Sequence, residues 1–251
     1  MSSNGTVDVY RLVLCVERHT SGLQGVNLHT IVKTYRPVND AGVMQHDAVV
    51  AVNKLKAAAA EQPLNCSQIA SACGDLISAC DAGLADRCLA ANTGAYDVLM
   101  SVLHADDSSA CIPVVLPALS SLLDGQPDVL EVRGATCVVN VLRDSVAVDS
   151  IIAALKLIRR CCILHEANRQ QFVALHIIPA TAGLLTTHHS HRELVQAACA
   201  VFSALTLDDD VRVQFGKSHE HAKAIVFEGN ALDMLLQLAS GRVLIIIKLT
   251  V

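Results

Sequence analysis

Tryptophan is absent from this 251-residue sequence, and aromatic residues make up only 3% of it. Charged residues are also scarce at 17%, whereas apolar residues reach 52%. Such a chain is not disordered over most of its length, because disordered segments lack apolar content. A core with few aromatic rings must be built from Ala, Leu, Val and Ile, which predicts closely packed helices covered on more than one side.

Clustered basic residues are missing as well, and the formal net charge is −5. Nucleic-acid binding depends on such clusters, so it is not expected. The longest apolar run, 243–251, contains Lys248 and is far shorter than the roughly 18 residues of a membrane span. The phosphate loop, the dinucleotide fingerprint and the nucleophile elbow are all absent. We therefore expect no enzyme activity, no cofactor and no membrane or small-molecule binding.

Ten cysteines are present, but the sequence shows neither a secretory signal nor a C-x-x-C pair. We expect reduced thiols and a cytoplasmic, or also nuclear, location. Cys66, Cys73 and Cys80 recur every seven residues, which places them on one face of a helix. Buried core positions are the favoured interpretation, because free cysteine behaves as a small apolar residue. A redox or metal role is the alternative.

Four segments differ in pattern along the chain. Residues 1–44 are rich in turn-forming residues and predict an irregular N-terminal arm. Residues 45–63 carry apolar side chains at spacings of three and four and predict an N-terminal helix ending at a proline. Residues 65–240 are repetitive, with about four repeats, and 241–251 form an atypical apolar tail.

Each repeat consists of a long apolar helix, a short helix, a tight turn and a medium helix. The predicted turns lie at Gly94, Gly134, His176 and Gly229, at intervals of about 40 residues before an insertion lengthens the last. We expect long helices at 65–82, 110–123, 149–164 and 191–207, short helices at 84–91, 127–132, 167–175 and 209–215, and medium helices at 95–104, 135–143, 177–187 and 231–239. Strand signals are almost absent, so the sequence predicts an all-α repeat solenoid.

Several polar strings within the repeats are distinctive. They include HEANRQ at 165–170, THHSH at 187–191 and LDDDVR at 207–212. On these strings and the three-helix rhythm, the chain resembles the armadillo-repeat-containing protein 6 family of armadillo-repeat proteins over about residues 22–240. The resemblance implies a right-handed armadillo-like solenoid that binds other proteins or peptides as a scaffold or adaptor.

Both ends depart from this family. Residues 1–20 lack its acidic lead-in, and the pattern stops after Ala239, where the family continues with further repeats. These departures predict a truncated isoform or a gene model read through an exon boundary. A truncated product without independent function is therefore one alternative to the scaffold.

Armadillo proteins often bind extended peptides on their long helices through a ladder of Trp and Asn. The equivalent positions here are Pro117 and Ser121, Lys156 and Arg160, and Ala200 and Ala204. The ladder is lost, so recognition of basic nuclear-localisation peptides is not expected. Lys156 and Arg160 lie one helical turn apart and are candidates to meet acidic groups of a partner, with Ser121 and Ser203 as further candidates. A solvated helix face is the alternative.

Histidines near an aspartate run suggest a metal-binding module as a second alternative function, since imidazole and carboxylate are zinc ligands. The candidate ligands are His188, His189, His191, His219 and His221. Their spacing matches no established metal signature, so polar loops are the favoured interpretation. Asp208, Asp209 and Asp210 are expected to cap the short helix that follows them.

A cysteine–histidine pair offers the only catalytic candidate. Cys161 and Cys162 lie three to four residues before His165, close enough on a helix for an imidazole to activate a thiolate. Nothing in the sequence would orient the imidazole, and the surrounding helix is apolar. Packed core is therefore expected instead of catalysis.

Overall fold

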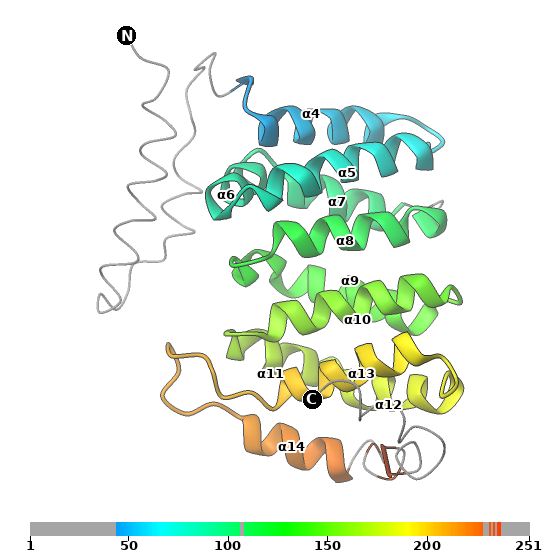
Figure 1. Ribbon diagram of the computed structural model, residues 1–251, viewed down its shortest axis with the longest axis vertical. Coiled ribbons are helices and arrows are strands. Elements are labelled where there is room, and N and C mark those ends of the chain that lie inside the picture. The colour runs from blue at the N-terminus through cyan, green and yellow to red at the C-terminus, as the bar shows by residue number, and fades with distance from the viewer. Residues whose placement is uncertain (1–43, 106–107, 228–230, 232, 234, 237–251) are drawn as a thin grey trace. The chain divides into compact units, whose positions relative to one another are not determined.

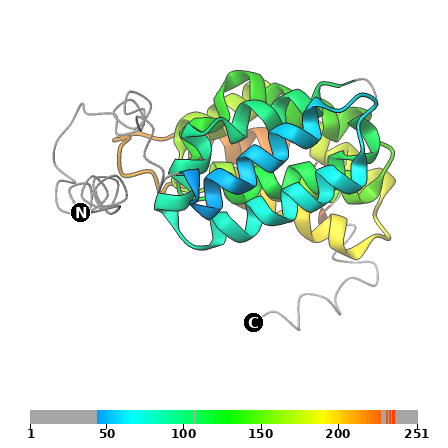
Figure 2. The ribbon, with the colours of Figure 1, turned by 90° about the horizontal axis from the view of Figure 1, so that it is seen from above.

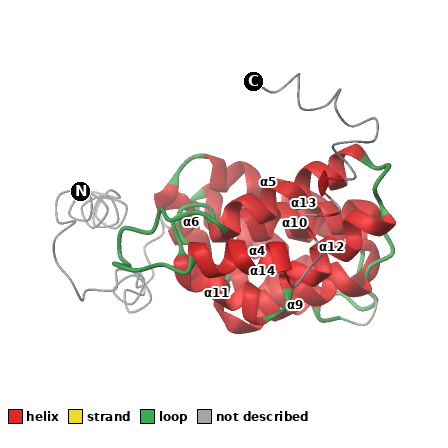
Figure 3. Ribbon diagram, turned by 90° about the horizontal axis from the view of Figure 1, so that it is seen from below, coloured by secondary structure: helices red, strands yellow, loops and turns green. Residues whose placement is uncertain are grey.

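The computed structural model describes residues 44–105 and 108–227 and a few positions between 231 and 236. Several predicted segments lie outside the described residues. They are the irregular arm except for its last residue, the turn at Gly229, most of the helix 231–239 and the tail 241–251. Within the described ranges all assigned elements are helical, and Figure 3 shows only helices and loops there. The predicted all-α class is confirmed.

The chain divides into two compact units, Met1–Val129 and Leu130–Val251, which are considered separately. Helices of the first unit are α4 (Asp47–Ala60), α5 (Cys66–Asp81), α6 (Leu84–Asn92), α7 (Ala95–Leu103), the 3-10 helix η1 (Ser108–Ala110) and α8 (Ile112–Leu122). The 3-10 helix η2 (Pro127–Leu130) lies at the junction in sequence. Helices of the second unit are α9 (Glu131–Asp144), α10 (Val148–Cys162), α11 (Glu166–Ala174), α12 (Ile177–Thr187), α13 (Arg192–Leu205) and α14 (Ser218–Phe227).

Helix α5 is the centre of the first unit. It packs between α4 and α8 (Figures 1 and 2). Helix α6 lies at the left end of α5 in Figure 1 and contacts α4, α5 and α8, whereas α7 lies behind and contacts α4 and α8. Its N-terminus is capped by the Asn65 side chain, which accepts hydrogen bonds from the amides of Ser67 and Gln68. Ile69, Ala72 and Leu76 are fully buried at spacings of three and four. The periodic apolar residues therefore produce the predicted helix-on-helix packing.

The second unit repeats this arrangement around α10. Helix α10 packs against α9 and α13, α11 and α12 connect it to α13, and α14 contacts α13 (Figure 1). Ile151, Leu155 and Ile158 form the buried stripe of α10, and Val201 belongs to that of α13. Helices α10, α11 and α12, with 15, 9 and 11 residues, follow the predicted order of long, short and medium. The order fails for α8, which has 11 residues and is shorter than α9 with 14.

Left-handed backbone marks the tight turns between helices. Gly94 (φ 98°) precedes α7 and His176 (φ 59°) precedes α12, and both turns were predicted. The turn predicted at Gly134 is wrong, because Gly134 is buried inside α9. Glu131, at φ 55°, takes the left-handed conformation at the start of that helix instead. A glycine inside the helix lets a neighbour pack closely, so its presence does not by itself locate a turn.

Candidate partner-binding surface

The exposed face of α10 carries the two predicted basic residues. Lys156 donates to Glu193 at the start of α13, with 2.7 Å between Nζ and Oε1. This hydrogen bond lowers the pKa of Glu193. Arg160 lies one turn further along α10 and is also exposed. The acidic group that Lys156 meets in this structure thus belongs to the same chain.

The two candidate serines lie in different units. Ser203 is exposed on α13, which packs against α10, so it belongs to the same unit as Lys156 and Arg160. Ser121 lies on α8 in the first unit, is half-buried, and its hydroxyl donates to Asp81 over 3.4 Å. We therefore define the α10–α13 surface by Lys156, Arg160 and Ser203 and treat Ser121 apart from it.

The five candidate histidine ligands have separate roles. His191 caps α13 by accepting the amide hydrogen of Leu194, and buried His221 is bonded through Nδ1 to the Leu205 carbonyl oxygen. His189 Nδ1 lies 3.2 Å from the Thr186 carbonyl oxygen, His188 ends α12, and His219 is exposed on α14. Over the described parts of the chain, no three His, Cys, Asp or Glu side chains are grouped to hold a metal ion.

The aspartate run does cap a helix, but a different one from the helix predicted. Residues 207–217 are not helical, so the predicted short helix 209–215 is wrong. Asp209 Oδ2 accepts the amide hydrogen of Leu164 at 3.1 Å, and Asp210 Oδ2 accepts that of Glu166 at 2.8 Å. The Asp210 carboxylate therefore satisfies an orphan N–H group at the start of α11, where the helix dipole also favours negative charge, and the Asp209 carboxylate binds the turn just before the helix.

A buried arginine links the same carboxylates to the core. Arg169 is only 1% exposed and pairs with Glu166 (Nε–Oε2, 2.7 Å) and with Asp209 (Nη1–Oδ1, 2.6 Å). Its guanidinium also donates to the Cys162 carbonyl at 2.8 Å. Burial on its own would raise the pKa of Glu166, but hydrogen bonds from Gln170 and Arg169 outweigh it and lower that pKa. The ionised pair is thus the stable form inside the protein.

The loop 206–217 is held at both ends by this cluster. Arg212 donates to Asp210 (Nε–Oδ1, 2.8 Å) and to the Leu164 carbonyl, while the Lys217 amide donates to Glu166 Oε1 at 2.8 Å. Burial would raise the pKa of Asp210, but the hydrogen bonds from Arg212 and the Glu166 amide hold it well below its ordinary value. We call Glu166, Arg169, Asp209, Asp210 and Arg212 the ionic cluster.

Between these anchors, the loop exposes apolar side chains. Val211 is 99% exposed and Phe215 is 83% exposed, and Leu164 beside the loop is 59% exposed. The loop follows α13 directly, and Leu164 lies just beyond the end of α10. Single exposed apolar side chains are common on protein surfaces, so the feature that sets these three apart is their position on or beside a loop held by the ionic cluster. These exposed side chains were not predicted, because Val211 and Phe215 fall within the short helix expected at 209–215.

The catalytic candidate is packed core, as predicted. Cys161 and Cys162 have no exposed surface, and burial raises the pKa of Cys161 to about 12. His165 Nδ1 accepts the amide hydrogen of Asn168, so its ring caps α11. A thiol with a raised pKa is a poor nucleophile at neutral pH, and this imidazole nitrogen already serves the backbone.

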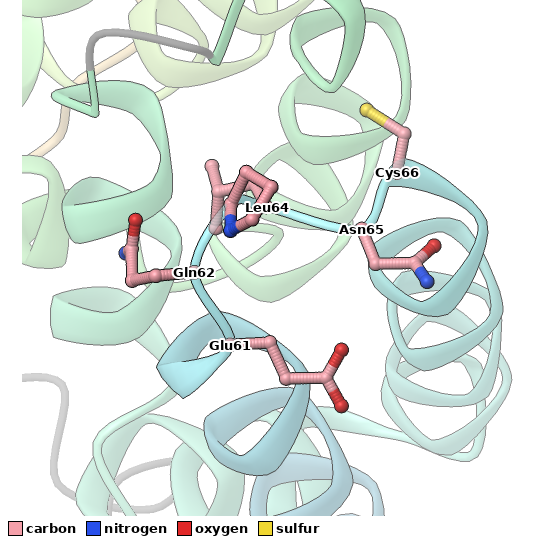
Figure 4. Close-up of a pocket in the computed structure, with 6 residues that line it drawn as sticks. Glu61, Gln62, Leu64, Asn65 and Cys66 are labelled. Atoms are coloured by element: carbon pink, nitrogen blue, oxygen red, sulfur yellow. The ribbon is translucent and has the colours of Figure 1, made fainter.

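In the first unit, one cysteine prediction needs correction. Cys73 and Cys80 are buried as expected, whereas Cys66 forms a disulfide with Cys111, so the expectation of reduced thiols is wrong for this pair. Their Cα atoms are 5.4 Å apart, within the ordinary range for such bonds. Cys66 also lines a pocket formed by residues 61–66 (Figure 4). The heptad spacing identified the helix face, but the partner lies 45 residues away and leaves no local signal.

Comparison with known proteins identifies relatives of the chain. It is 34% identical over 220 residues to armadillo repeat-containing protein 6 from Pongo abelii and from Homo sapiens, covering 85% of this chain and 43% of each relative. The Drosophila melanogaster homologue is 30% identical over 223 residues, covering 86% of this chain and 46% of that protein. The predicted resemblance is confirmed, and the chain spans less than half the length of these curated relatives. No family model matches the sequence.

Proposed function

Since the chain is homologous to armadillo repeat-containing protein 6 over 85% of its length, we propose that it is a non-catalytic scaffold or adaptor that binds other proteins. The contact region in this proposal is the α10–α13 surface together with the adjoining loop 206–217. The observation that carries the proposal is the pair of exposed apolar residues Val211 and Phe215 on a loop fixed by the ionic cluster.

Polar residues next to the apolar loop would supply specificity. Protein interfaces combine a few buried aromatic or arginine anchors with a polar rim. Phe215 provides an aromatic anchor, and Arg160 and Lys156 provide charged groups on the adjacent helix. Lys156 is already paired with Glu193, but both side chains are more than half exposed, so a partner carboxylate can displace Glu193 at little cost.

The proposed location is the cytoplasm, with the nucleus as a second compartment. Seven of the described cysteines are free, and free thiols persist in reducing compartments, whereas the Cys66–Cys111 disulfide does not support this location. Among the described helices, none is long and apolar enough to cross a membrane.

Affinity capture with matched variants tests the proposal. The Lys156→Glu/Arg160→Glu variant and the Phe215→Ser variant are compared with the wild-type chain. Lys54→Glu is the control, because Lys54 also lies on an exposed helix face and pairs with Asp75 at similar exposure. We expect the wild type and the control to retain the same protein partners, and each test variant to lose them by about tenfold, the effect of about 1.4 kcal/mol.

Binding measurements with purified proteins decide whether the proposed surface is correct. Each captured protein is expressed, and its dissociation constant is measured by titration against the four chains. Equal affinity for all four chains would refute the proposed surface, and a wild-type chain that binds no protein above the bead control would refute the scaffold. Circular dichroism of each variant checks that the helices are intact.

A further inference from the structure

The Cys66–Cys111 disulfide joins two consecutive long helices of the first unit. Cys66 is the first residue of α5, and Cys111 is the residue immediately before α8. The two helices also pack against each other along their lengths. The bond is therefore a cross-link between neighbouring repeats whose packing already holds them together, so opening it does not require the unit to unfold.

The two cysteines of this bond differ in access to solvent. Cys111 has no exposed surface, whereas Cys66 is half-buried. Cys66 also lines a pocket of about 630 Å³ at the turn between α4 and α5 (Figure 4). The other residues that line it are Glu61, Gln62, Pro63, Leu64 and Asn65. A reagent in solution can thus approach the disulfide from the Cys66 side and not from the Cys111 side.

The pocket is an open depression on the protein surface, lined by both polar and apolar atoms. Its volume lies within the range of small-ligand sites, about 300–1,000 Å³. Glu61 offers a carboxylate that can pair with an ammonium group, and Gln62 offers an amide that can both donate and accept. A tripeptide thiol such as glutathione carries an ammonium group, carboxylates and amides as well as its sulfur atom.

We propose that Cys66–Cys111 is an exchangeable disulfide and that a low-molecular-weight thiol of the glutathione class enters this pocket and attacks the sulfur of Cys66. In the first step the thiolate forms a bond to Cys66 Sγ, the bond between the two cysteines breaks, and Cys111 leaves as a thiolate that takes up a proton. A second thiol then attacks the mixed disulfide. It releases Cys66 as a thiol and leaves the two small thiols joined as their own disulfide.

The remaining cysteines of α5 are excluded from this chemistry. Cys73 and Cys80 follow Cys66 at heptad spacing but are buried in the helix packing, and burial raises the pKa of each to about 12. Both therefore stay protonated at neutral pH, and neither borders the pocket. The exchange is selective for one of the three cysteines on this face.

Two variants of the full chain test the selectivity. In Cys111→Ser the resolving thiol is gone, so incubation with oxidised glutathione should trap a mixed disulfide on Cys66. In Cys66→Ser the remaining Cys111 is buried, so it should gain no glutathione. The adduct is located by fragment mass spectra without reductant, and Cys73→Ser serves as the control that should behave as the wild type.

The wild type provides the second readout. Under oxidised glutathione the peptides that carry Cys66 and Cys111 should become resistant to alkylation without gaining glutathione, and excess reduced glutathione should restore both thiols. Modification of Cys111 in Cys66→Ser to the same extent as Cys66 in Cys111→Ser would overturn the selectivity. If Cys66 and Cys111 stay alkylatable in the wild type under oxidised glutathione, the disulfide itself would be overturned. Circular dichroism confirms that each variant is folded before its labelling is compared.

Discussion

Replacing Arg169 with methionine removes the only cation bonded to buried Glu166 in the described ion pairs while keeping an apolar side chain of similar length. In this variant, the Glu166 side chain, which is 1% exposed, loses its ion pair. The Asp209 side chain, which is 26% exposed, loses one of its two hydrogen-bond donors. The Cys162 carbonyl oxygen also loses a donor. Breaking a buried ion pair by removing one partner costs about 3–5 kcal/mol, and we expect the free energy of unfolding to fall by that amount near neutral pH.

The loss should depend on pH in a definite direction. In the wild type the pKa of Glu166 is lowered, so its ionised form stabilises the fold above the ordinary pKa and that stability disappears as the pH falls. Without Arg169, burial raises the pKa of Glu166. The folded state of the variant is therefore most stable below the ordinary pKa of a glutamate, and its free energy of unfolding falls as the pH rises. The difference between the two proteins should therefore be larger at about pH 7 than at about pH 4.

Urea unfolding followed by circular dichroism at both pH values measures these differences, with Lys156→Met as the control. Lys156 belongs to an exposed ion pair, so its replacement should leave the unfolding midpoint unchanged. Hydrogen exchange gives a local readout, since the Lys217 amide donates to Glu166 and should exchange faster in the variant. A loss below about 1 kcal/mol, or an equal loss at both pH values, would refute the buried, ionised pair.

Three further changes test the capping, the backbone and the cross-link. His165→Ala removes the cap of α11 and should lower the free energy of unfolding by about 1 kcal/mol in urea titration. Gly94→Ala places a side chain at φ 98° and should lower it by about 1–2 kcal/mol, whereas Gly74→Ala, with open space around its Cβ position inside α5, should raise it by about 0.5–1 kcal/mol. Cys111→Ser should lower it by about 2–4 kcal/mol, but only relative to wild type kept without reductant.

The helices could be predicted because their signals are local. The medium helix predicted at 177–187 matches α12, Ile177–Thr187, and the left-handed turns at Gly94 and His176 were located correctly. Each prediction used apolar spacing or a backbone preference within one helical turn. The turn at Gly134 failed because Glu131 carries the left-handed conformation, and a glutamate gives no indication of positive φ.

The candidate site was less predictable because its contacts are distant in sequence. Lys156 was a candidate to bind an acidic group of a partner, yet it pairs with Glu193 of the same chain, 37 residues further along the sequence. Asp210 was expected to cap the next helix, yet its carboxylate reaches Glu166, 44 residues earlier. The capping chemistry of aspartate was correct, but a single sequence does not reveal which exposed N–H groups lie within its reach.

The ionic cluster explains why an irregular loop can stand in place of a short helix. A helix satisfies its own backbone groups, whereas the loop 206–217 needs side chains to fix its ends, and Glu166 and Asp210 provide them. A buried ion pair adds little stability compared with apolar packing, so its main contribution here is to orientation. Phe215 lies between these two anchors in the sequence and is 83% exposed. The loop proposed as a binding site is therefore fixed at Asp210 and Lys217 by the protein itself. Such preorganisation would lower the entropic cost of ordering the loop when a partner binds.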